Sequence, residues 1–142
     1  MKNKKVIFSL IGIFVICFVG LTVFFGIRSI KAHDKMWEYF DIYRLEAETY
    51  IQTSPEISDK YGKKLCVKFD NSVSYSETGE RNIFNVFSDT FNPQAPKNLD
   101  EFNKKVYRIE FEVDINGDPY EIIFVRNDQG ILAVSSLELL EN

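Results

Sequence analysis

A run of 22 uncharged residues at positions 6–27 constrains this chain more than any other feature of its sequence. Only Ser9, Cys17 and Thr22 within it carry polar side-chain atoms. A helix of that length, at about 1.5 Å per residue, spans roughly 33 Å, and the hydrocarbon core of a bilayer is about 30 Å thick. The apolar region of a cleaved signal peptide is shorter, about 7–15 residues, and no clear cleavage site follows this run. We therefore predict an uncleaved transmembrane helix at residues 6–27.

The charge of the chain changes sign after this run. Residues 1–30 hold four basic side chains and no acidic one, which leaves 13 basic and 21 acidic side chains, a net charge of −8, for the remaining 112 residues. Three lysines within the first five residues favour a cytoplasmic N-terminus. We expect a single-pass protein of the cell membrane with its C-terminal domain outside. Its parts are a basic flank at 1–5, the anchor at 6–27 and an acidic α+β domain at 28–142.

A second helical pattern follows the apolar run. Met36, Phe40, Tyr43, Ala47 and Tyr50 recur at steps of three or four residues, which predicts an amphipathic helix over residues 31–52 with these side chains in the core. No Pro or Gly separates this segment from the apolar run, so the two helices can be continuous.

The next helix is short and has clear signals at both ends. Ser54 and Pro55 are typical of the N-cap and the first helical position. Gly62 is typical of the residue that follows a helix C-terminus. Together they predict a short helix that ends at Tyr61.

From residue 63 onward the apolar period changes to two, as in β-strands. The strongest strand signal covers residues 105–115, with Tyr107, Ile109, Phe111, Val113 and Ile115 expected on one face and Val106, Arg108, Glu110, Glu112 and Asp114 on the other. Asn116-Gly117 then predicts a hairpin turn. Further strands are predicted around residues 64–69, 73–75, 81–87, 120–126 and 131–140, with the longest loop at 88–99. The predicted domain is a small two-layer α+β unit in which the long helix packs on a four- to five-stranded antiparallel meander sheet.

Few residues offer catalytic or metal-binding chemistry. The one His, His33, has no Cys or carboxylate partners at the spacing of a zinc site. The segment that begins at Asp114 resembles a calcium-binding loop, but the Gly and Glu that such a loop needs are misplaced, and a hairpin explains the same residues. Cys66 is interpreted as a small apolar strand residue, although Lys64 and Lys68 beside it would activate an exposed thiol. We expect no catalytic residue, no metal, no cofactor and no small-molecule substrate.

What remains is a surface. The acidic domain is repelled by phosphates, which argues against nucleic acid as a partner. One face of the predicted hairpin is expected to carry Glu110, Glu112 and Glu121. Three roles are open for them: a solvated face with cross-strand ion pairs, the paired carboxylates of a glycosidase, or a surface that binds another protein. Phe91, in the long loop, is an aromatic of the kind that anchors protein interfaces. We predict that these four residues bind a basic or polar protein, with the membrane contacted through residues 6–27.

In plan the chain resembles two kinds of small anchored protein. One is the membrane-anchored immunity protein, a resemblance that implies a non-enzymatic module which neutralises a toxin or cell-envelope enzyme at the membrane surface. The other is the assembly factor of respiratory oxidases, which the segment from Ser54-Pro55-Glu56-Ile57 to Gly62 and the strand after it resemble. That resemblance implies an accessory subunit of a membrane complex. The immunity or inhibitor protein is our first hypothesis, the assembly subunit the second, and an envelope hydrolase the third.

Overall fold

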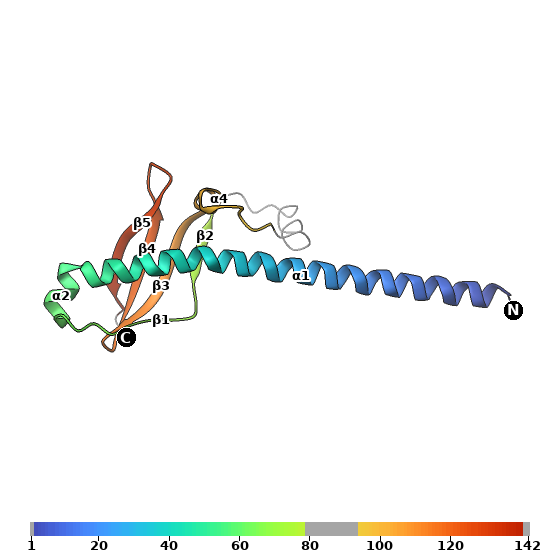
Figure 1. The fold of residues 1–142 in the computed structure, drawn as a ribbon, viewed down its shortest axis with the longest axis horizontal. Coiled ribbons are helices and arrows are strands. Elements are labelled where there is room, and N and C mark those ends of the chain that lie inside the picture. The colour runs from blue at the N-terminus through green and yellow to red at the C-terminus, as the bar shows by residue number, and fades with distance from the viewer. Residues whose placement is uncertain (1, 79–93, 141–142) are drawn as a thin grey trace. The chain divides into compact units, whose positions relative to one another are not determined.

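The computed structural model describes residues 2–78 and 94–140, with side chains from residue 11 onward (Figure 1). Its fold is α+β, with a long N-terminal apolar helix and a five-stranded antiparallel sheet, so this part of the fold prediction is confirmed. The elements are helices α1 (Lys2–Thr53) and α2 (Pro55–Tyr61), strands β1 (Val67–Phe69) and β2 (Ser74–Glu77), helix α4 (Leu99–Lys105), and strands β3 (Val106–Ile115), β4 (Asp118–Arg126) and β5 (Leu132–Leu139).

The described chain belongs to two compact units, one with residues 2–35 and 94–95, the other with residues 36–78 and 96–140. In the first unit, the large apolar side chains of α1 from Ile11 to Ile30 are largely exposed. Among the described residues, α1 is the helix that is long and apolar enough, by length and composition, to cross a membrane, and its most apolar window is 0% buried. The transmembrane role of residues 6–27 stays a prediction.

In the second unit, the C-terminal part of α1 packs on the sheet. Its buried side chains are Tyr39, Phe40, Tyr43, Ala47 and Ile51, and they share one core with the inner residues of β3 and β4. Tyr50, which was expected in this core, is 42% exposed, whereas Ile51 is 0% exposed. The prediction for Tyr50 is wrong because the buried stripe steps by four residues from Ala47 rather than by three.

The strand order is β1-β3-β4-β5, and β2 also pairs with β3, so that β1 and β2 lie along the same edge of β3. All pairings are antiparallel. Ile109, Phe111, Val113 and Ile115 are buried as expected. At the start of β3, Val106 and Tyr107 lie on the opposite faces from those expected. The register shifts between Ser76 and Glu77, so that Glu77 pairs with Val106. Val106 is therefore buried and Tyr107 is exposed.

The two short helices differ in how well the sequence predicted them. For α2, Pro55 occupies the first turn and Gly62 follows the helix with a positive φ of 75°, as predicted, although the Ser54 side chain makes no cap hydrogen bond. Helix α4 was not predicted. The side chain of Asn98 accepts a hydrogen bond from the Glu101 amide at its N-terminus, and Phe102 fixes the helix in the core. The strand predicted at 81–87 and the first half of the predicted loop at 88–99 lie outside the described residues.

Candidate functional site

Three glutamates form a row across three strands on the face of the sheet opposite the core. Glu112 lies opposite Glu121 in the β3–β4 pair, and Glu121 lies opposite Glu138 in the β4–β5 pair. Glu110 lies two residues from Glu112 on the same face and forms an ion pair with Arg108. The structure thus brings together three of the four residues predicted to bind a partner. The fourth, Phe91, lies outside the described residues.

The row of glutamates, Glu112, Glu121 and Glu138, is electrostatically unfavourable. Partial burial raises the pKa of Glu121, and the nearby carboxylates of Glu110, Glu138 and Glu112 raise it further, whereas Arg108 opposes the shift. Like charges directly opposite each other destabilise a pair of strands. The ionised row therefore costs stability in the free protein, and a cation brought to this face would relieve the repulsion.

Replacing Glu121 by Gln is expected to stabilise the protein at neutral pH. A carboxyl whose pKa is raised in the folded state favours folding below its ordinary pKa, about 4.3, and loses that contribution as the pH rises through the folded value. At pH 7 the Gln variant therefore gains about 0.2–1 kcal/mol, towards the lower end because water screens this partly exposed group. Urea unfolding at pH 7 should show the gain, and it should vanish at about pH 3.5, where the carboxyl is protonated in both states.

The matched control for this measurement is Asp128→Asn, in the turn that follows β4 and outside the row. It should change the unfolding midpoint little at either pH. A Glu121→Gln variant that is less stable than the wild type at pH 7 would show that the repulsion across the row is unimportant.

A second polar cluster joins α2 to the β3–β4 hairpin. The Lys60 ammonium donates to the Tyr120 hydroxyl at 2.9 Å and lies 3.1 Å from the Asp118 carboxylate. The Tyr61 hydroxyl donates to the same carboxylate and lies 3.0 Å from the Tyr120 hydroxyl. The hydrogen bond to Tyr120, with those to Tyr61 and Asp118, raises the pKa of Lys60, and those from Tyr61 and Lys60 lower the pKa of Asp118. Burial and the bond to Asp118 raise the pKa of Tyr61 to about 12.

Because Lys60 stays charged and Asp118 stays ionised over the whole neutral range, this cluster acts as a fixed clamp between α2 and the hairpin. Its groups bond to one another, which leaves no unpaired acid or base for proton transfer within it. We therefore assign it a structural role.

Cys66 occupies a different environment from the one predicted. It lies directly before β1 and is exposed, with a free thiol, so the interpretation as a buried apolar residue is wrong. The short strand β1 lies at the edge of the sheet, and its outward-facing positions are open to water. The backbone of Cys66 is nevertheless fixed, because its amide donates to the side chain of Asn116 at 2.7 Å and its carbonyl accepts from the Asn116 amide at 3.0 Å.

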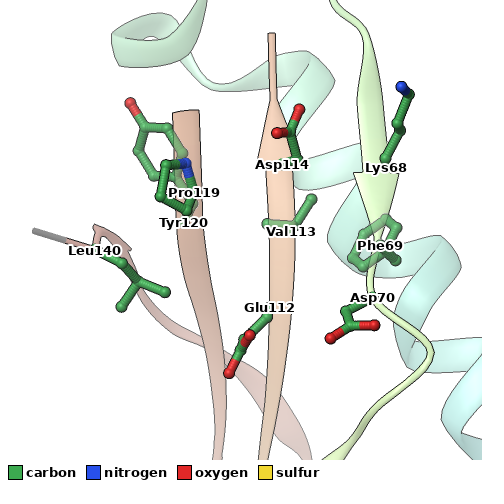
Figure 2. A pocket seen from close by; sticks show the side chains of 9 residues that line it. All are labelled: Lys68, Phe69, Asp70, Glu112, Val113, Asp114, Pro119, Tyr120 and Leu140. Carbon is green, nitrogen blue, oxygen red and sulfur yellow. The ribbon is translucent and has the colours of Figure 1, made fainter. Parts of the chain in front are cut away.

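A cavity of about 270 Å³ lies beside β1, β3 and β4. Figure 2 shows the side chains that line it. Lys68 lines it from β1, and Glu112 and Asp114 line it from β3. Lys68 lies two residues after Cys66 along the chain, and Glu112 belongs to the glutamate row. Within the described ranges, no group of three His, Cys, Asp or Glu side chains is placed to hold a metal ion. The arrangement instead suits contact with polar and charged side chains of another protein.

The other sequence interpretations have clear outcomes. The carboxylate of Asp114 accepts a hydrogen bond from the Gly117 amide, and Asn116 has a positive φ of 56°, so this segment is the predicted hairpin turn rather than a calcium loop. The aromatic side chains of Phe102 and Tyr120 are buried in the core and are not available to a partner. The glutamate in β5, Glu138, was missed because the register of β5 against β4 contains a bulge that the sequence does not reveal.

Comparison with known proteins gives one similarity. The chain is 30% identical over 116 residues to "Cysteine desulfuration protein SufE" of Plasmodium falciparum. The match covers 72% of this chain and 42% of the relative, so the chain spans less than half of that protein's length. The chain matches no protein family profile, and no solved structure gives a significant match.

This similarity overturns the first functional hypothesis. A relative in cysteine desulfuration is at odds with a signal-anchored immunity or inhibitor protein that neutralises a toxin or an envelope enzyme, so that prediction is wrong. It gives no support to the respiratory-oxidase or hydrolase alternatives. A non-enzymatic protein that works with a protein partner is compatible with it. The predicted location, with the N-terminus in the cytoplasm and the domain outside the membrane, is tested by none of these observations and stays a prediction.

Proposed function

We propose that this protein is a non-enzymatic accessory protein of cysteine desulfuration, which receives sulfur on Cys66 from a partner protein. The observation that carries the proposal is the similarity to a cysteine desulfuration protein over 72% of the chain. The exposed, free thiol of Cys66 supports it, because this side chain has the chemistry that the role requires.

Desulfuration takes a sulfur atom from cysteine, and that atom needs an acceptor. A thiolate is the protein group best suited to attack sulfur. In the proposed step, the Cys66 thiolate attacks the outer sulfur of a persulfide on the partner. A new sulfur–sulfur bond forms on Cys66, the bond in the partner breaks, and the partner's thiolate leaves. The step needs neither oxidant nor reductant, and its product is a cysteine persulfide, a reversible form of the residue.

The position of Cys66 favours contact with a second protein. The thiol is exposed, so a partner can reach it without opening the fold. The two backbone hydrogen bonds to Asn116 hold Cys66 against the hairpin, which reduces the entropy lost when the transfer complex forms. The other cysteine, Cys17, lies in the apolar run of α1 and serves as an internal control.

The partner is proposed to dock on Glu110, Glu112, Glu121 and Phe91, the residues that the sequence predicted for binding, together with Glu138, which completes the glutamate row. The row repels itself in the free protein, so basic side chains of a partner would gain from binding there. Glu112 and Lys68 both line the cavity, and Lys68 is two residues from Cys66 along the chain. A partner large enough to cover both the row and the cavity would reach the segment that carries the acceptor thiol.

Cys66→Ser is expected to abolish sulfur acceptance. The full-length chain in mild detergent is incubated with radiolabelled cysteine and a purified cysteine desulfurase, and the label on the chain is measured together with the mass of the Cys66 peptide. The wild type and Cys17→Ser should gain one sulfur on Cys66, and Cys66→Ser should gain none. A wild-type chain without label on Cys66, or equal labelling of Cys66→Ser, would refute the proposal.

A second arm of the same experiment tests the docking face. Glu110→Gln combined with Glu112→Gln should slow labelling at low salt and converge with the wild type at high salt, because screening removes the electrostatic attraction. Labelling that is equal at both salt concentrations would leave Cys66 as the acceptor and reject this face as the docking site.

A further inference from the structure

We propose that the free edge of β5 pairs with β5 of a second copy of this chain, in antiparallel orientation about a two-fold axis between Ser135 and Ser136. The proposal is independent of the sulfur-acceptor function. Among the described strands, β5 pairs with β4 alone, so its other edge presents unpaired backbone groups. Such an edge is a template for another strand.

The side chains of β5 match a second copy of the same strand. Around the point between Ser135 and Ser136, the apolar residues of segment 131–140 are arranged symmetrically. An antiparallel pair would place Leu132 opposite Leu139 and Val134 opposite Leu137, with Ile131 opposite Leu140. Three of these side chains, Ile131, Leu139 and Leu140, are exposed by 52%, 48% and 37% in the single copy. The pairing would cover them with identical or similar apolar groups.

Because of a bulge in β5, the residues that the two-fold axis relates also lie on the same face of the sheet. Ile122 lies opposite Leu137 and Phe124 opposite Val134, so Ser135 is an extra residue on β5. In a regular strand, positions 134 and 137 would point to opposite faces. The bulge puts both on the core face together with positions 132 and 139. A two-fold pair then continues the core face of one sheet into that of the other.

The backbone groups have the same symmetry. The Leu140 amide donates to Pro119 and the Ile131 carbonyl accepts from the Asn127 amide, so residues 131 and 140 direct these groups towards β4. Hydrogen-bonding direction alternates along a strand. If this alternation is followed from Ile131 and from Leu140 towards the middle of the strand, the backbone groups that point to the free edge are those of Leu132, Val134, Leu137 and Leu139. These are the residues that the two-fold pairing opposes to one another.

The charges of β5 also permit the pairing. The strand lacks Lys and Pro, which commonly protect natural sheet edges, and its one charged residue is Glu138. In the proposed pair Glu138 faces Ala133, and the two copies of Glu138 lie about 13 Å apart along the strands. No like charges meet across the interface. A partner strand of different sequence would have to match both the bulge and the apolar positions, whereas a second copy matches them by symmetry.

The mass of the full-length chain in mild detergent, measured by light scattering over a concentration series, tests the proposal. The wild type should form a dimer. Leu139→Lys and Ile131→Lys should each raise the dissociation constant by about tenfold or more, because they place charges in the interface. Both residues are largely exposed in the single copy, so the variants are expected to fold. Tyr107→Lys is the matched control, because Tyr107 is an exposed apolar side chain on β3, away from this edge, and should leave the dimer intact.

Amide hydrogen exchange gives a second readout that needs no variant. The amides of Leu132, Val134, Leu137 and Leu139 should exchange more slowly as the protein concentration rises. A wild type that stays monomeric at every concentration would overturn the proposal. So would a dimer that Leu139→Lys and Ile131→Lys leave unchanged, since that dimer would form through another surface.

Discussion

Phe102→Ala is expected to lower the free energy of unfolding by about 3–5 kcal/mol. Phe102 is 0% exposed although it belongs to the seven-residue helix α4. Its ring centroid lies 5.0 Å from that of Tyr39, 5.4 Å from that of Phe40 and 5.9 Å from that of Tyr43. Removing the ring leaves a cavity among three aromatic side chains of α1 that a helix of this stiffness cannot close.

Urea unfolding of the full-length chain, followed by circular dichroism, measures this loss. Phe102→Leu retains most of the apolar volume and should cost less than Phe102→Ala. Tyr107→Ala removes an exposed ring and should cost about 0.5 kcal/mol or less. If Phe102→Ala and Tyr107→Ala had similar effects, α4 would contribute nothing to the attachment of α1 to the sheet.

Asn116→Val is expected to destabilise the hairpin and to displace Cys66. Asn116 has a positive φ of 56°, which costs a β-branched residue about 1–3 kcal/mol. Its side chain also accepts from the Cys66 amide at 2.7 Å and donates to the Lys64 carbonyl at 3.2 Å. Each of these hydrogen bonds contributes about 0.5–1.5 kcal/mol. The total loss is expected to be about 2–6 kcal/mol.

Asn116→Gly separates the two contributions. Glycine adopts a positive φ without strain, so this variant loses the side-chain hydrogen bonds and keeps the turn. It should lie between the wild type and Asn116→Val in stability. Its Cys66 should react with a small thiol reagent as fast as in the wild type, because the thiol is already exposed. Sulfur transfer from the partner should nevertheless be slower, because the segment around Cys66 is no longer held. Unchanged transfer would mean that Asn116 does not position Cys66.

The sequence predicted those parts of the fold that depend on local signals. Asn116-Gly117 specifies a turn with a positive φ, and the alternation after Ile109 specifies which face of β3 is buried. Pro55 and Gly62 similarly mark the ends of α2. In each case the decisive interaction lies within a few residues along the chain, so periodicity and turn chemistry are sufficient.

The remaining features depend on contacts between distant residues. Helix α4 fully buries one side chain, Phe102, and its seven residues are too few for a clear helical period. The reversal at Val106 and Tyr107 depends on the register of β2, some thirty residues earlier in the chain. The glutamate row requires the register of three strands, including a bulge in β5. Glu110, Glu112 and Glu121 could be predicted because the hairpin turn sets the register of β3 and β4. Glu138 could not be predicted, because the bulge in β5 has no local sequence signal.

The two edges of the sheet set a limit on how far assembly can proceed. On one side, β3 is bordered by two separate strands of three and four residues, β1 and β2, with residues 70–73 between them. Short, interrupted edges of this kind are poor templates for further strands. If two chains join through β5, both outer margins of the combined sheet have this form. Growth into a fibril by repeated edge-to-edge addition would then stop at two chains.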